Sequence, residues 1–220
     1  TALFNFVFAK ANKGKFKLRI ENTDELRTVE NVTESLIKDL NWLGINSDTE
    51  VVYQKNNIQN HLEVANEMIK NKIAYRCYCN EKEISNLKSL QKGKISKFRS
   101  PWRNKKENEC PKNKDYVVRL KIPDDFQIII NDEVQGKIIV NSKEIDDFIL
   151  VRSNKKPTFL LSSAVDDLEM NISHIIRGDD HLTNTFRQYF IFKFLNKKLP
   201  RFSHIPLIHG EDGKKLSKRD

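Results

Sequence analysis

Residues 165–188, VDDLEMNISHIIRGDDHLTNTFRQ, decide the fold of this chain. The segment from Ile172 to Ile176 is short and rich in β-branched side chains, which predicts a buried strand that ends at Gly178. Thr183 is expected to cap a following helix, whose apolar positions recur at helical spacing: Phe186, Tyr189, Phe190, Phe194 and Leu195. The stretch therefore predicts a strand, a polar turn and a helix.

The polar turn carries Arg177, Asp179, Asp180 and His181. In open α/β sheets, ligands bind beyond the carboxyl ends of the strands, so these four side chains are predicted to lie at a ligand site. Taken by itself, the turn has a second interpretation, which is a surface turn with an ordinary ion pair.

Composition narrows the class of protein. A chain of 220 residues can bury a sizeable core in one or two domains, and it contains no apolar run long enough to span a membrane and no signal peptide. Three cysteines, an odd number, argue against a secreted disulfide framework and for a reducing compartment. The net charge of +9 favours a polyanionic partner, nucleic acid before membrane, although a genome biased toward Lys and Asn would give the same balance.

Both ends suggest a piece of a longer protein. The chain opens on Ala2–Phe8 as if already inside a buried helix, without a starting methionine or a capping residue, and closes on the basic run Lys214–Asp220.

Residues 1–79 read as the first half of a doubly wound α/β domain. Phe16, Leu18 and Ile20 alternate with charged residues, which predicts a strand that runs into an acidic turn at Glu21. The other elements expected here are helices over Ala2–Ala11, Asn31–Leu43 and Ile58–Lys72 and a strand over Ala74–Cys79.

Residues 80–157 have a different character and read as an inserted module. A capping box at Asn80–Glu83 predicts a short helix, and the stretch Lys88–Lys106 is strongly basic, with Phe98 and Trp102 interleaved. This stretch predicts either phosphate contacts along a nucleic acid backbone or a solvated, flexible segment. Short strands are expected at Tyr116–Lys121, Ile128–Ile130, Lys137–Val140 and Phe148–Arg152.

From residue 158 the α/β pattern resumes, with a final strand near Phe202–Ile208. Beyond it, Lys215-Leu216-Ser217-Lys218 follows two glycines. Mobile ammonium groups and a hydroxyl on such a loop suit the binding of a triphosphate and the stabilisation of charge on leaving pyrophosphate. A basic surface tail is the alternative.

Together these pieces resemble bacterial-type glutamyl-tRNA synthetase, a class I aminoacyl-tRNA synthetase, along nearly the whole chain. The ordered matches are Thr1–Asn5, Leu18–Asp24, Trp42–Gly44, Tyr75–Cys79, Asp146–Phe148, Arg152-Ser153, Pro157–Phe159, Val165–Asp167, Ile176–Leu182, Asn184-Thr185, Arg187-Gln188, His204–Leu207 and Lys215–Arg219.

The resemblance implies a Rossmann-like, doubly wound parallel sheet with an inserted α+β module that binds the tRNA acceptor stem. The catalytic halves would be residues 1–79 and 158–220, and the module residues 80–157. The implied reaction activates L-glutamate with ATP and Mg²⁺, releases pyrophosphate, and transfers the glutamyl group to the 3′ terminal adenosine of tRNA(Glu) for protein translation. Positioning and charge stabilisation would carry the rate. The parent protein is expected to be a monomer in the cytoplasm of a bacterium or in a bacterially derived organelle.

The resemblance also implies a set of site residues. Those for glutamate are Glu21, Arg177, Phe159 and Ser163. Those for ATP are Asp180, Leu207, Ile208 and Lys218, with Lys215, Ser217 and Lys218 stabilising the phosphates in the transition state. Those for tRNA are Asp24, Lys97, Arg99 and Arg103.

Several positions depart from the family pattern. Phe159 stands where a tyrosine is usual, Ser163 replaces an asparagine, and Asn22 replaces an aspartate. Some members bind zinc at a place where this chain keeps Cys77, Cys79 and Cys110, but Lys112 occupies the fourth position, so zinc is not expected. The family's first signature would lie before Thr1, and the isolated segment is therefore expected to be nearly inactive.

Three alternatives stay open at this point. The chain could come from the truncated paralogue that glutamylates a modified tRNA base, from a glutaminyl enzyme, or from a non-catalytic RNA-binding relic.

Overall fold

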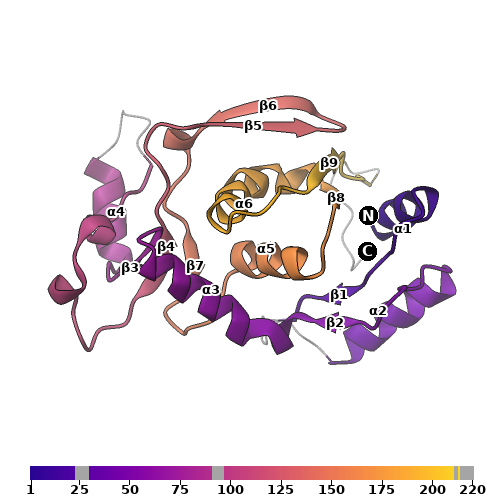
Figure 1. Ribbon diagram of the computed structural model, residues 1–220, viewed down its shortest axis with the longest axis horizontal. Coiled ribbons are helices and arrows are strands. Elements are labelled where there is room, and N and C mark those ends of the chain that lie inside the picture. Colours follow the sequence, from indigo (N-terminus) through magenta and orange to yellow (C-terminus); the bar gives the residue numbers. More distant parts are fainter. Residues whose placement is uncertain (23–29, 91–96, 211–212, 214–220) are drawn as a thin grey trace.

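The computed structural model describes residues 1–22, 30–90, 97–210 and 213 (Figure 1). The α-helices of this part are α1 (Ala2–Ala11), α2 (Glu30–Trp42), α3 (Ile58–Lys70), α4 (Glu81–Leu90), α5 (Phe159–Glu169) and α6 (Leu182–Phe194). The strands are β1 (Arg19–Ile20), β2 (Val52–Tyr53), β3 (Ala74–Cys77), β4 (Val117–Leu120), β5 (Gln127–Asp132), β6 (Gly136–Asn141), β7 (Ile149–Val151), β8 (His174–Gly178) and β9 (Arg201–Ile205). Among the described residues, every helix is too short or too polar to cross a membrane.

The strands form three sheets. β1 and β2 make a parallel pair, β3, β4 and β7 make an antiparallel sheet, and the third sheet has the order β6-β5-β9-β8. In the third sheet β8 and β9 run parallel, from His174↔Arg201 to Gly178↔Ile205, with α6 connecting them. Parallel pairs with helical connections are the predicted α/β architecture.

Helices α5 and α6 lie in the middle of the molecule, between the β5–β6 hairpin and α3 (Figure 1). One core joins them to both neighbours, because the buried cluster includes Ala65 and Met68 of α3, Ile128 of β5, Leu161 of α5 and Phe190 of α6. β3 pairs with β4, and β4 pairs with β7. Residues on the two sides of position 79 therefore share a sheet. The division into residues 1–79, 80–157 and 158–220 stays a proposal.

Most predicted elements are present with small changes at their ends. The helix at Ala2–Ala11 has the predicted bounds. The capping box is also present, since the Asn80 backbone N–H donates to Glu83 Oε2 and the Glu83 backbone N–H donates to Asn80 Oδ1. The strand predicted over residues 16–20 is limited to Arg19–Ile20, because the backbone N–H groups of Phe16 and Leu18 are bonded to side chains of the loop at Asp48 and Ser47.

Two predictions around the central turn are wrong. β8 is only partly buried along its whole length, because it is the edge strand of its sheet and its free side borders a hollow. Thr183 does not cap α6: a 3₁₀ turn at Asp179–His181 comes first, and the helix starts at Leu182 with His181 as its N-terminal flanking residue.

Candidate active site

A hollow of about 780 Å³ lies between β1 and β8 and is bordered by α1 and α5. It is bordered by all four residues that the resemblance assigns to glutamate: Glu21, Phe159, Ser163 and Arg177. Glu21 follows β1 and Arg177 lies near the end of β8, so both come from the carboxyl ends of parallel-sheet strands, where the sequence predicted a ligand site.

Arg177 is a partly buried cation whose direct hydrogen-bond partners are neutral. Its Nε donates to His204 Nε2 at 3.2 Å, and its Nη2 donates to Thr185 Oγ1 at 2.7 Å and to Gln188 Oε1 at 3.0 Å. Burial lowers the pKa of Arg177 to about 10, so the group is still charged at neutral pH. These partners fix the guanidinium without neutralising it, which leaves it able to bind an anion.

Carboxylates surround this cation at longer range. Asp167, Asp180 and Glu21 each act to raise the pKa of Arg177, in that order of strength, against the effect of burial. Among the described residues, however, Arg177 has no carboxylate within ion-pair distance. The field at the hollow therefore holds a positive centre beside negative groups, which suits a zwitterionic ligand.

Glu21 provides an open carboxylate on the opposite wall. Its side chain is 41% exposed, and Arg19 Nη2 lies 3.3 Å from Glu21 Oε1. Arg19 is in turn held by Asp167 of α5, with 2.7 Å between Arg19 Nη1 and Asp167 Oδ1. This shared guanidinium joins β1 to α5 and orients Glu21 toward the hollow.

Ser163 and Phe159 form the wall on α5. The Ser163 hydroxyl donates to the Phe159 carbonyl at 2.7 Å and accepts from Gln188 Nε2 at 2.7 Å, so its proton is already committed within the helix. The Phe159 ring faces the His181 ring at 5.8 Å between centroids. These residues therefore offer an apolar surface and an indirect link to Arg177 through Gln188.

The residues assigned to ATP lie just beyond the strand ends. Asp180 is exposed in the 3₁₀ turn after β8, and Leu207 and Ile208 follow β9. Gly178 lies between the two groups, because a Cβ added there would be 2.6 Å from Asp180 Oδ1 and 2.8 Å from Leu207 Cδ2. Lys215, Ser217, Lys218 and Asp24 lie outside the described residues.

The residues assigned to tRNA differ in their surroundings. Lys97 is exposed. Arg99 and Arg103 instead form ion pairs inside the segment 80–157: Arg99 Nε lies 3.2 Å from Asp124 Oδ1, and Arg103 Nε lies 3.0 Å from an oxygen of the fully buried Asp147. Both arginines therefore have a structural role, and a contact with RNA stays a prediction for them.

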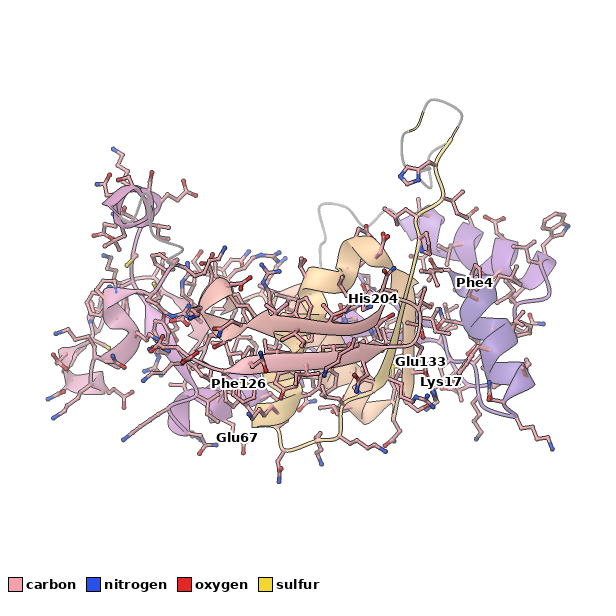
Figure 2. The ribbon with its side chains drawn as sticks, turned by 90° about the horizontal axis from the view of Figure 1, so that it is seen from above. Phe4, Lys17, Glu67, Phe126, Glu133 and His204 are labelled. Carbon is pink, nitrogen blue, oxygen red and sulfur yellow. The ribbon has the colours of Figure 1, made fainter. Side chains whose placement is uncertain are left out.

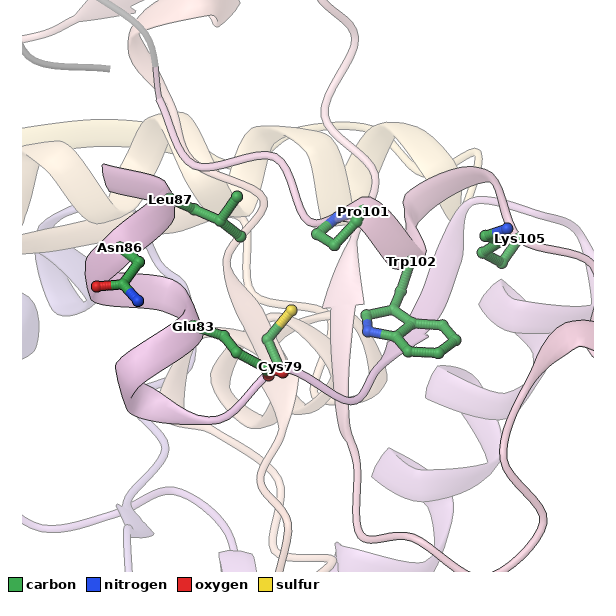
Figure 3. Close-up of a pocket in the computed structure, with 7 residues that line it drawn as sticks. All are labelled: Cys79, Glu83, Asn86, Leu87, Pro101, Trp102 and Lys105. Carbon is green, nitrogen blue, oxygen red and sulfur yellow. The ribbon is translucent and has the colours of Figure 1, made fainter. Parts of the chain in front are cut away.

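The three cysteines do not come together as a metal site in the part of the chain that the structure describes. The thiols of Cys77 and Cys79 both contact Ser100 Oγ, at 3.2 and 3.5 Å, and Cys110 Sγ donates to the Lys106 carbonyl. Cys79 borders a second hollow of about 410 Å³ between α4 and the turn at Trp102 (Figure 3). In the described part of the chain these thiols therefore do not form a set of ligands that fits zinc.

Sequence reasoning assigned no role to several residues that hold the site together, namely Arg19, Asp132, Asp167, Gln188 and His204. A polar residue inside an apolar strand was a usable signal for His204, which lies in Phe202–Ile205 and is fully buried. Asp132 gave no such signal, because it sits at a predicted turn far away in the sequence.

Comparison with known proteins defines the class. The chain matches the family described as tRNA synthetases class I (E and Q), catalytic domain, over residues 1–220, and it belongs to this family. Within the class it is similar to proteins that are named glutamate–tRNA ligase. The identity is 51% to one from Ehrlichia canis and 48% to one from Orientia tsutsugamushi, each covering all of this chain and 47% of the relative.

Solved structures agree with this placement and confirm the fold class. A glutamate tRNA ligase from Elizabethkingia meningosepticum, in complex with its amino acid, matches with a TM-score of 0.85 and 29% identity, over 100% of this chain and 48% of that one. A glutamate-tRNA synthetase from Elizabethkingia anophelis matches with a TM-score of 0.84 and 28% identity, over 99% of this chain and 48% of that one. The chain thus spans about half the length of the relatives that it matches.

Proposed function

We propose that this chain supplies the catalytic domain of a glutamate–tRNA ligase. The complete protein would activate L-glutamate with ATP to glutamyl-adenylate, release pyrophosphate, and transfer the glutamyl group to the 3′ terminal adenosine of tRNA(Glu). The names of the relatives support this assignment, and they do not favour the paralogue that modifies a tRNA base or the glutaminyl enzyme.

The observation that carries the proposal is the placement of Arg177 and Glu21 on one hollow. Glutamate has an ammonium group and two carboxylates. Glu21 would bind the ammonium group and Arg177 a carboxylate, since Arg19 holds the Glu21 side chain in place and neutral partners hold the charged guanidinium of Arg177. Phe159 and Ser163 would shape the wall between them.

ATP would lie beyond β8 and β9. Asp180 would bind the ribose, and the backbone at Leu207 and Ile208 would contact adenine. Lys215, Ser217 and Lys218 would hold the phosphates. Mg²⁺ would enter as the complex with ATP, and the chain's own residues would act on the phosphates.

In the first step a glutamate carboxylate oxygen would attack the α-phosphorus of ATP and pyrophosphate would leave. In the second step a ribose hydroxyl of the terminal adenosine would attack the activated carbonyl carbon and AMP would leave. Positioning of the reacting groups and stabilisation of the phosphate charge would supply the rate enhancement. Asp24, Lys97, Arg99 and Arg103 would bind the tRNA, and the enzyme would act as a monomer.

The test is charging of tRNA(Glu) and glutamate-dependent exchange between ATP and pyrophosphate by the complete protein in the presence of tRNA. In the variant Arg177→Gln the KM for glutamate should rise roughly 100-fold or more, because a partly buried, charged hydrogen-bond partner of the substrate is lost. Arg76→Gln is the matched control, since Arg76 pairs with the exposed Glu107 and the KM should not change.

Two results would contradict the proposal. A complete protein that binds tRNA in a salt-sensitive way but has no affinity for ATP would be an RNA-binding relic. A complete protein that leaves the terminal adenosine free and glutamylates an internal base would be the truncated paralogue.

A further inference from the structure

The tip of the β5–β6 hairpin lies against β9, directly behind Arg177. Figure 2 labels Glu133 and His204 close together where the hairpin ends. Asp132 pairs in parallel register with Phe202, and its carboxylate accepts from the backbone N–H groups of His204, Val134 and Gln135. The hairpin belongs to residues 80–157, yet Asp132, the last residue of β5, contacts His204, which in turn contacts Arg177 of the candidate glutamate site.

Asp132 and His204 form a fully buried pair. His204 Nδ1 lies 2.6 Å from Asp132 Oδ2, and neither side chain is exposed. Burial raises the pKa of Asp132, but hydrogen bonds from Gln135, His204 and Val134 outweigh this effect and hold it below its ordinary value. An ionised carboxylate can only accept a hydrogen bond, so the proton of a neutral His204 ring must be on Nδ1.

This tautomer has a consequence on the other side of the ring. With the proton on Nδ1, Nε2 is a hydrogen-bond acceptor, and it lies 3.2 Å from Arg177 Nε and 3.0 Å from Thr185 Oγ1. The opposite tautomer would place an N–H against the N–H of Arg177.

We propose that Asp132 is a positioning residue for glutamate recognition: it fixes the tautomer of His204, and His204 then aims the guanidinium of Arg177 at the substrate carboxylate. The inference rests on the proposed function and deepens it. It makes the inserted segment a structural part of the amino-acid site, separate from any contact that the segment makes with tRNA.

Asp132 also has a purely structural task, since it holds the hairpin turn through backbone N–H groups. The variant Asp132→Asn separates the two roles. Asparagine keeps an oxygen for those backbone groups, but its amide N–H faces His204 Nδ1 and drives the ring proton to Nε2. The KM of the complete protein for glutamate should rise about tenfold or more, while the KM for ATP and the melting temperature change little.

Glu133→Gln is the matched control. Glu133 is the next acid in the same turn, and it accepts from Ser203 Oγ and pairs with Arg201 on the surface. Its loss removes the same charge from the same turn but does not touch His204, so the KM for glutamate should remain within about twofold of the wild-type value.

Replacement of the histidine gives a second, independent readout. In His204→Gln the amide oxygen can accept from Arg177 without any tautomer to control. Asp132→Asn should therefore raise the KM for glutamate much less in the His204→Gln background than in the wild type. An equal effect in both backgrounds, or an equal KM for Asp132→Asn and Glu133→Gln, would overturn the inference.

Nitrogen NMR of the ¹⁵N-histidine-labelled complete protein reads the tautomer without any assay of activity. We expect the proton of His204 on Nδ1 in the wild type and on Nε2 in Asp132→Asn. If the protein activated no glutamate at all, the proposed function would fail, and this spectrum would still show whether Asp132 sets the tautomer of His204. The same tautomer in both proteins overturns the inference.

Discussion

Gly178 ends β8 with φ −62° and ψ 148°, an extended conformation that any residue adopts. Its requirement for glycine therefore comes from its neighbours and not from its backbone. Asp180 Oδ1 and Leu207 Cδ2 are so close that even a methyl group would displace one of them. Both residues belong to the proposed ATP site. Because Gly178 has no side chain, the proposed contacts with ribose and adenine can lie next to each other.

The variant Gly178→Ala should raise the KM for ATP by roughly tenfold, because the added methyl group moves Asp180 or Leu207 from its place. Steady-state kinetics of the complete protein with ATP as the varied substrate measures this. Gly14→Ala is the control, since its added Cβ comes no nearer than 3.4 Å to another atom. Equal KM values for ATP in the two variants would show that the space at Gly178 does not matter for ATP.

At the scale of elements, a buried polar cluster attaches α5 to α3. Asp166 of α5 accepts from His61 Nε2 at 2.6 Å and from the side-chain amides of Gln54 and Asn57, each at 2.7 Å. The next residue, Asp167, holds Arg19 and through it Glu21. These two neighbouring acids thus have different roles: Asp166 joins α5 to α3, and Asp167 positions a side chain of the proposed glutamate site.

Asp166→Asn should lower the free energy of unfolding by about 3 kcal/mol at neutral pH, because the new amide N–H would face the donors of Gln54, Asn57 and His61, which need an acceptor. Urea denaturation measures this, and Asp39→Asn, on the exposed face of α2, is the control and should be neutral.

The stabilisation by Asp166 should also depend on pH. Burial raises its pKa, but the bonds from His61, Asn57 and Gln54 outweigh this and leave the pKa below its ordinary value. A carboxyl group whose pKa is lower in the folded state binds more protons in the unfolded state. Its contribution to the free energy of unfolding is therefore complete above about pH 4, and it disappears as the pH falls through the pKa of the folded state. The difference in stability between wild type and Asp166→Asn should shrink in that range. A difference that is constant with pH would contradict the ionised state of Asp166.

At the scale of the whole molecule, the excess of positive charge is not all available to a partner. Arg99 and Arg103 surround the buried Asp147, which also accepts from the Tyr75 hydroxyl and the Ile122 backbone N–H. Lys97 is exposed next to them. The net charge of +9 supports binding to a polyanion, but within the described part of the basic stretch some of the cations balance internal acids.

Two substitutions should separate these roles. Lys97→Ala should weaken tRNA binding by the complete protein and reduce the slope of log affinity against log salt by about 1, without an effect on stability. Arg103→Ala should lower the free energy of unfolding by about 2 kcal/mol or more, because it leaves Asp147 buried with fewer partners. Salt titration of tRNA binding and urea denaturation, each applied to both variants, check this. A loss of tRNA affinity in Arg103→Ala at unchanged stability would assign Arg103 to RNA alone.

The sequence by itself determined the order of most elements and the chemistry at the strand ends. Local periodicity was enough to predict that Glu21 follows a strand and that Arg177 ends one, whereas their placement at one glutamate site was implied by the resemblance to the family. The same reasoning failed where a neighbour decided the outcome. Burial of β8 depends on which strands pair with it, and the start of α6 depends on a 3₁₀ turn that the capping rule does not detect.

Only the tertiary structure decided what fixes those side chains. The bond from Asp132 to His204 crosses a parallel strand pairing that joins segments far apart in the sequence, and register of that kind is set by packing and not by local preference. The ion pairs that occupy Arg99 and Arg103 arise in the same way, since the sequence shows a basic run but not the acids folded against it. Residue types along the chain therefore predicted which charges the site needs, while long-range contacts decided which of them are oriented, buried or left open to a ligand.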